Sequence, residues 1–151
     1  MVKRYASAVW QGSLRDGTGS VSTTSRALEN VRYSFTSRFE DGALGTNPEE
    51  LIAAAHASCF AMALSAQLDS RGLTAVSIKT HCRVTLERKA EGWSITDSEL
   101  EVVAHVPGAD ITTFEAAVGQ AKDGCPVSRL LNAAVTVSAY LEAADTMGMV
   151  G

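Results

Sequence analysis

Hydrophobic and polar residues alternate along the first third of the chain, and this pattern predicts strands. Val31, Tyr33 and Phe35 share one parity, whereas the residues between them are polar. A period of two is typical of a strand with one buried face. We therefore predict a strand over Tyr5–Trp10 and a second over Val31–Phe39, with the turn-rich segment GSLRDGTGS between them.

The next segment carries the start and stop signals of a long helix. Asn47 is a suitable N-cap, Pro48 suits the first helical position and Glu50 the third, so Asn-Pro-Glu-Glu resembles a capping box. Gly72 suits the C-terminal stop. We predict a helix over Pro48–Arg71. Its middle, LIAAAHASCFAMAL, is apolar on nearly every face, which indicates a helix buried on all sides.

The second half of the chain returns to strands and shorter helices. SIKTHCRVTLE and SITDSELEVVAHV alternate as strands, joined by a hairpin turn at Gly92. Asp110 is expected to cap a helix that ends at Gly124, and Pro126–Asn132 to form another helix. AVTVSAYLE then predicts a final strand.

This order of elements predicts an α+β fold with a mostly antiparallel sheet, in a single domain over residues 1–151 with a loosely ordered tail at about 143–151. A long helix that is buried on all faces needs more cover than one small sheet provides. We therefore predict an intimate homodimer.

Composition and charge exclude several classes of protein. The chain is 46% hydrophobic and 20% charged, and its formal net charge is −4. Nucleic acid and anionic membranes would need a basic patch, so neither is an expected partner. The N-terminus lacks a signal-peptide core, and the apolar run over 51–64 is too short to span a bilayer. We expect a soluble, cytoplasmic protein.

Three cysteines are the candidates for chemistry, since the sequence contains no C-x-x-C pair, no metal-binding histidine spacing and no sign of a metal or organic cofactor. Cys82 lies on the inward parity of a strand and is interpreted as a core residue. Cys125 precedes a helix, where the dipole favours the thiolate. Cys59 lies far inside the long helix, so its thiolate needs a cation, for which Arg38 and Arg15 are the candidates.

Two segments resemble the OsmC family of organic hydroperoxide peroxidases. FTSRFEDGALGTNPEELIAAAHASCFAMALS is similar to the family's signature, and KDGCPVSRLL is similar to its second cysteine motif. AVWQGS, GTGSVST and the final strand also fit, so the resemblance covers roughly Val2–Glu142. Because RFE precedes the loop, the chain resembles the OsmC branch more than the Ohr branch. The resemblance implies an antiparallel sheet wrapped around a long central helix in an intertwined, domain-swapped homodimer.

The resemblance also assigns roles to residues. Cys59 matches the peroxidatic cysteine, Cys125 the resolving cysteine and Glu49 the catalytic glutamate. Arg38 matches the arginine that stabilises the thiolate in the OsmC branch, and Arg15 matches its counterpart in the Ohr branch. The implied reaction reduces organic hydroperoxides, and hydrogen peroxide less well. It passes through a sulfenic acid and a disulfide that an external dithiol, possibly on a lipoylated protein, reduces.

Spacing adds a condition to these roles. Glu49 and Cys59 are ten residues apart, which is roughly 15 Å along a straight helix. One arginine cannot easily bridge both within one helix, so we expect the Arg38–Glu49 pair beside a given Cys59 to come from the other subunit. Apolar residues of the helix are expected to favour organic peroxides if they face the site: Ile52, Ala55, Phe60 and Met62.

Three other functions stay open at this point. The first is a redox-sensing dimeric stress protein whose cysteines are oxidised without turnover. The second is a cysteine hydrolase with His56, three residues before Cys59, as its base, although no acid partner is evident and His56 is interpreted as a packed helix residue. The third is a structural dimer that uses the long helix only for assembly.

Overall fold

The computed structural model describes residues 1–143, so nearly all of the predicted tail at about 143–151 lies outside the described residues. Contacts divide the chain into two compact units, Met1–Leu51 and Ile52–Gly151. The single domain over 1–151 stays a prediction.

The first unit is built on a three-stranded antiparallel sheet in the order β1-β2-β3. Its strands are β1 (Ala6–Gln11), β2 (Thr18–Thr23) and β3 (Val31–Tyr33). Gly19 pairs with both Trp10 and Tyr33, whose ring centroids are 5.6 Å apart. A Cβ at Gly19 would meet both rings within 3 Å, so only glycine leaves room for this aromatic pair.

The predicted strand over Val31–Phe39 is wrong beyond Tyr33, because a short helix, α1 (Phe35–Phe39), takes its place. Ser34 caps this helix in a capping box with Ser37, in which each side chain accepts from the other residue's backbone N–H. Two local hydrogen bonds therefore override the alternation of polar and apolar residues. Arg38 lies on this helix and not on a strand.

The long helix α2 (Pro48–Asp69) begins and ends almost as predicted. Asn47 accepts the Glu50 N–H at 2.8 Å, although Glu50 itself bonds the Thr46 hydroxyl and does not complete the capping box. Gly72 adopts a φ of 73°, and the Leu73 N–H bonds the Leu68 carbonyl, which is a Schellman ending.

The prediction that α2 is buried on all sides is not met within one chain. The stripe His56, Phe60, Leu64 and Leu68 is fully buried. The other face is exposed and consists mainly of small residues, with Met62 at 75% exposure. The helix thus has one buried face and one exposed face, although both faces are apolar in composition.

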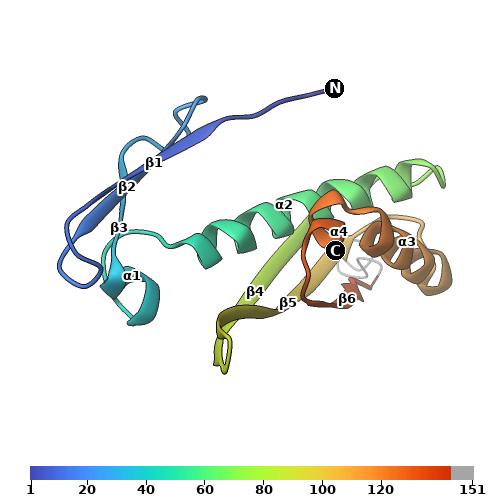
Figure 1. Cartoon of the computed structure of the whole chain (residues 1–151). Helices are drawn as coiled ribbons and strands as arrows, with labels where there is room; N and C mark the ends of the chain where they lie inside the picture. Colours follow the sequence, from blue (N-terminus) through green and yellow to red (C-terminus); the bar gives the residue numbers. More distant parts are fainter. Residues whose placement is uncertain (144–151) are drawn as a thin grey trace. The chain divides into compact units, whose positions relative to one another are not determined.

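The second unit contains a three-stranded sheet with helices on one face (Figure 1). Its strands are β4 (Ser77–Lys89), β5 (Gly92–His105) and β6 (Ala134–Leu141), and its helices besides α2 are α3 (Ile111–Gly124) and α4 (Pro126–Leu130). The β4–β5 pair is an antiparallel hairpin, as predicted, whereas β6 pairs with β5 in parallel. Helices α3 and α4 form the crossover that this direction requires.

The buried core lies between this sheet and α2 and α3. Alternate residues of β5 point inward, and α3 contributes one face after its Asp110 N-cap, which accepts the Thr113 N–H at 2.7 Å. The alternate burial along β5 agrees with the alternation that predicted this strand, and the capping by Asp110 agrees with the predicted start of α3. Its members are Phe60, Leu64, Leu68, Leu100, Val102, Ala104, Val106, Phe114, Ala117, Ala121 and Cys125.

Candidate active site

Arg38 and Glu49 form a short, partly buried ion pair in the first unit. The Arg38 Nη2 donates to Glu49 Oε1 at 2.6 Å, and its Nε lies 3.2 Å from both carboxylate oxygens. The two side chains are 38% and 10% exposed, respectively. Asn47 ties the start of α2 to α1, since its amide donates to the Ser37 carbonyl. This bond fixes the guanidinium and the carboxylate on adjoining helix ends.

Arg15, the alternative arginine, is placed differently. Its guanidinium carbon lies 4.7 Å from the centroid of the Phe35 ring, which is a cation–π contact. Glu49 therefore has Arg38 as its partner, and Arg15 is held by an aromatic ring. Which of the two arginines stabilises the thiolate stays a prediction.

An apolar pocket of about 250 Å³ adjoins Arg38 within the first unit. Aromatic side chains dominate its wall, and Arg38 is the charged residue among those that line it. The pocket is lined by Trp10, Leu14, Tyr33, Ser34, Phe35, Arg38, Phe39 and Pro48. A pocket of this kind suits an apolar molecule that carries one polar, hydrogen-bonding end.

Cys59 and Cys125 lie side by side in the second unit, with their sulfur atoms 3.2 Å apart. Cys59 is half-buried on α2, and Cys125 is buried between α3 and α4. The backbone of Cys125 ends α3, where its N–H bonds the Ala121 carbonyl, and begins α4 before Pro126. A disulfide needs a sulfur separation of about 2.05 Å, so a small side-chain movement would join the two thiols.

The two thiols differ in acidity. Burial raises the pKa of Cys59, and the neighbouring Cys125 raises it further. Burial also acts to raise the pKa of Cys125, but interactions with the backbone N–H and hydroxyl of Ser128, with Cys59 and with the Val127 N–H lower it overall. The Cys125 sulfur makes no N-cap hydrogen bond of full geometry, so its stabilisation comes from several donors together.

His56 takes part in a hydrogen-bond network that was not predicted from the sequence. Its Nδ1 lies 2.6 Å from the Ser98 hydroxyl, and its Nε2 lies 2.7 Å from the Ser128 hydroxyl. The sulfur of Cys82 lies 3.3 Å from the Ser98 hydroxyl oxygen. His56 is thus more than a packed residue, and its two nitrogen atoms bond serines rather than Cys59, which removes the geometric basis of a hydrolase pair. Phe60 is fully buried in the core, so in this chain it cannot line a site open to substrate.

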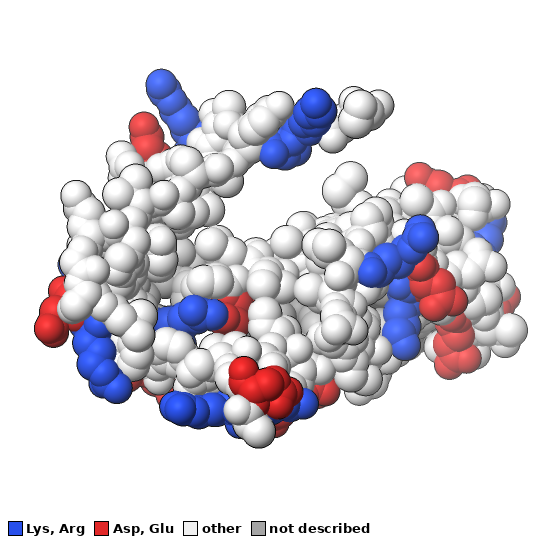
Figure 2. Space-filling model, viewed as in Figure 1, with Lys and Arg blue, Asp and Glu red and all other residues white. Residues whose placement is uncertain are grey.

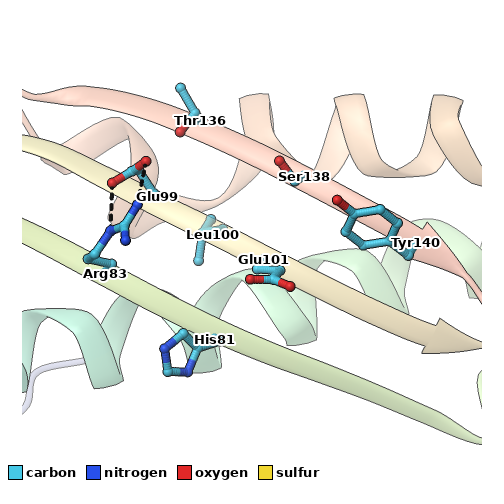
Figure 3. A pocket seen from close by; sticks show the side chains of 8 residues that line it. All are labelled: His81, Arg83, Glu99, Leu100, Glu101, Thr136, Ser138 and Tyr140. Carbon is cyan, nitrogen blue, oxygen red and sulfur yellow. Dashed lines mark hydrogen bonds and ion pairs between the residues drawn. The ribbon is translucent and has the colours of Figure 1, made fainter.

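A second concave surface, of about 260 Å³, lies on the outer face of β4, β5 and β6 (Figure 3). Figure 3 shows Arg83 paired across the strands with Glu99, with bonds of 2.9 and 3.1 Å. His81, Glu101 and Tyr140 project from the same face. None of the three thiols lines this surface, so it is not where cysteine chemistry occurs.

Other ligand classes find little support in the described part of the chain. Residues 1–143 contain no group of three or more histidine, cysteine or acidic side chains placed to hold a metal ion. On the face drawn in Figure 2, basic and acidic side chains are interspersed among neutral ones. The helix α2 is long and apolar enough to cross a membrane, contrary to the expectation from residues 51–64, but a core helix of a soluble protein has the same length and composition.

An α+β chain with two adjacent thiols, one of them lowered in pKa, has the groups that a dithiol redox protein needs. Comparisons with known proteins make this class specific. Residues 40–139 match the family model of OsmC-like proteins. The chain is 45% identical over 141 residues to Peroxiredoxin OsmC of Escherichia coli, which covers 93% of this chain and 98% of the relative, and equally to Peroxiredoxin OsmC of Shigella flexneri.

The chain therefore belongs to the OsmC family, on the OsmC branch, and this places it among the peroxidases. Solved structures agree on the fold. An OsmC-like protein of Vibrio cholerae superposes with a TM-score of 0.74 at 15% identity, covering 92% of this chain and 99% of that one. The organic hydroperoxide resistance protein OhrB of Bacillus subtilis gives 0.66 at 22% identity, covering 91% and 98%.

Proposed function

We propose that this protein reduces organic hydroperoxides, and hydrogen peroxide less well, by a two-cysteine mechanism in oxidative and osmotic stress defence. The observation that carries the proposal is the 3.2 Å separation of the Cys59 and Cys125 sulfur atoms. Two thiols at that distance can be oxidised to a disulfide and reduced again without rearrangement of the fold. The names of the relatives, which refer to peroxiredoxins and to organic hydroperoxide resistance, support the same chemistry.

In the first step the Cys59 thiolate attacks one peroxide oxygen. The O–O bond breaks, the leaving alkoxide takes up a proton and departs as an alcohol, and the sulfur is oxidised to a sulfenic acid. Because burial raises the pKa of Cys59, this step needs a cation that stabilises the thiolate. Arg38, oriented by Glu49, supplies that charge in the proposal.

In the second step Cys125 attacks the sulfur of the sulfenic acid. A disulfide forms between Cys59 and Cys125, and the hydroxyl group leaves as water after it has gained a proton. An external dithiol then reduces the disulfide and is itself oxidised to a disulfide. A lipoylated protein is the proposed carrier of this dithiol. The reaction would take place in the cytoplasm, where free thiols persist.

A homodimer is part of the proposal. The first unit contributes no residue to the buried apolar core, and it exposes large hydrophobic side chains that include Tyr5, Val9 and Leu14. The exposed face of α2 consists mainly of small residues, which permit close approach of a second helix. A second copy of the chain would bury both surfaces. Because Glu49 and Cys59 are ten positions apart on α2, the Arg38–Glu49 pair that serves a given Cys59 would come from the partner.

The apolar pocket beside Arg38 supports organic peroxides as substrates. Its aromatic wall suits an alkyl or aryl group, and the guanidinium suits the peroxide oxygens. Hydrogen peroxide would use only the polar end of this pocket, so binding would contribute less to its reduction.

Peroxide consumption with dihydrolipoamide as reductant tests the proposal. The wild-type protein should turn over an organic hydroperoxide many times, and Cys59→Ser should abolish turnover. Cys82→Ser is the matched control, because Cys82 is also half-buried, is neither of the two proposed redox thiols, and a serine hydroxyl can make the same hydrogen bond to Ser98. Equal rates for the wild type and Cys59→Ser would overturn the proposal. A single disulfide without turnover would instead indicate a redox sensor.

A further inference from the structure

A buried chain of polar side chains connects three elements of the second unit. His56 of α2 bonds Ser98 of β5 at 2.6 Å and Ser128 of α4 at 2.7 Å. His56 and Ser98 are fully buried, and Ser128 is half-buried. At one end the Cys82 sulfur lies 3.3 Å from Ser98 and 3.9 Å from the His56 Nδ1. At the other end Ser128 lies three residues after Cys125 on α4, and its backbone N–H and hydroxyl are among the groups that lower the pKa of Cys125.

Burial lowers the pKa of His56, which favours the neutral imidazole at the centre of this network. A neutral imidazole carries one donor nitrogen and one acceptor nitrogen. If Nε2 donates to Ser128, the Ser128 proton is free to point at Cys125. In that state Nδ1 accepts from Ser98, and Ser98 accepts from the Cys82 thiol. In each hydrogen bond of the network the proton is then donated in the direction of Cys125.

We propose that His56 is a positioning residue for Cys125: it holds the Ser128 hydroxyl with its proton directed at the Cys125 sulfur and thereby favours the thiolate. The role of that thiolate as the resolving nucleophile rests on the proposed function. The thiolate attacks the sulfenic sulfur of Cys59, an S–S bond forms, and the S–O bond breaks. The departing hydroxide takes up the proton that Cys125 had lost to solvent, and leaves as water. His56 neither gains nor loses a proton in this step.

This inference gives His56 a role that packing alone does not require. For a histidine that only fills the core, any two hydrogen-bonding partners for its ring nitrogens would be sufficient. Here both partners are hydroxyls, which can reverse their donor and acceptor roles, and one of them, Ser128, belongs to the helix that begins at Cys125. The titratable groups that face His56 are Cys82 from β4 and, through Ser128, Cys125, with Cys59 one turn further along α2.

The experiment measures the acidity of Cys125 directly. In a Cys59→Ser, Cys82→Ser background Cys125 is the single remaining thiol, since the chain has three cysteines. Its thiolate is followed by ultraviolet absorbance as the pH is raised. His56→Phe and Ser128→Ala should each raise the midpoint by about one pH unit, because the thiolate loses a directed donor. His56→Gln, whose amide can donate to Ser128, should keep the midpoint close to that of the background with His56 intact.

Two controls separate positioning from structure. Thr80→Val, a change of similar size on the neighbouring strand β4, should leave the midpoint unchanged. Thermal unfolding shows whether each variant is folded, and Ser128→Ala at its half-buried position keeps the test usable if His56→Phe does not fold. A raised midpoint in Ser128→Ala together with an unchanged one in His56→Gln and His56→Phe would overturn the role of His56. Unchanged midpoints in all three variants would overturn the proposal that this hydrogen-bond network acts on Cys125.

The inference can fail separately from the proposed function. The thiolate midpoint needs no peroxide, so it is measured whether or not the protein is a peroxidase. In the wild-type cysteine background, His56→Phe should still form the Cys59 sulfenic acid at the normal rate with one equivalent of organic hydroperoxide. Its disulfide should then form about tenfold more slowly near neutral pH. If no sulfenic acid forms even in the wild type, the proposed function has failed and the midpoints alone decide the inference.

Discussion

The two units of the chain differ in how much apolar core they contain and in which candidate reactive groups they carry. The second unit holds the whole buried apolar core and all three thiols, whereas the first unit holds the Arg38–Glu49 pair and no residue of that core. The first unit is therefore organised by hydrogen bonds, an ion pair and contacts between aromatic rings, and the second by apolar burial. The cation proposed for the reaction therefore belongs to the first unit, which has no residue of the buried core and is less able to fold by itself than the second unit.

The largest expected difference between the units is in stability. Phe114→Ala in the second unit should lower the free energy of unfolding by about 3–5 kcal/mol, because the fully buried ring leaves a cavity. Trp10→Ala in the first unit should cost about 1 kcal/mol, since its ring is 37% exposed and its aromatic contact is with Tyr33. Urea unfolding at one fixed protein concentration measures both. Equal losses would show that the first unit is as well packed as the second.

The next effect is catalytic and tests whether the units cooperate between subunits. Arg38→Ala should reduce peroxidase activity about a hundredfold, and its residual rate should rise with pH, because burial raises the pKa of Cys59 and more thiolate forms at high pH. Arg15→Ala, the matched control, should retain most activity. If the site is shared between subunits, a mixed dimer of Cys59→Ser and Arg38→Ala chains would contain one complete site and should recover about half of the wild-type activity. A mixed dimer without activity would contradict the shared site.

The smallest expected effect concerns an imperfection in the second unit. Within the described residues, the Thr80 hydroxyl is buried and has no hydrogen-bond partner. Thr80→Val should therefore stabilise the protein by about 1 kcal/mol, since an unsatisfied buried hydroxyl is replaced by a methyl group of the same shape. Thermal unfolding measures the change. A lower melting temperature would mean that the hydroxyl has a partner in the assembled protein.

Local signals in the sequence predicted much of the fold. The Asn47–Pro48 start and the Gly72 end of α2 were found because capping depends on residues only a few positions apart. The Ser34 capping box was missed, because the alternation around it imitates a strand. The parallel pairing of β6 was missed as well, since residues on a strand indicate which face is buried but not the direction of the neighbouring strand.

The candidate site was predictable from the sequence only where a family motif marked it. By local physics Cys125 was the better nucleophile and Cys59 a buried helix residue, and the lowered pKa of Cys125 agrees with that reasoning. The role of Cys59 as peroxidatic residue stays a prediction. The His56 network gave no signal in the sequence, because its partners Ser98 and Ser128 lie 42 and 72 positions away.

Strand β1 has a consequence for the life of the protein before assembly. All six of its residues are exposed, and in the described part of the chain it has a strand partner on one side only. An uncovered edge strand is a template on which other chains can add strands and aggregate. If the proposed dimer covers this strand, the hazard is confined to the interval between synthesis and assembly. A cell that makes this protein rapidly under stress would therefore depend on the speed with which new chains find each other.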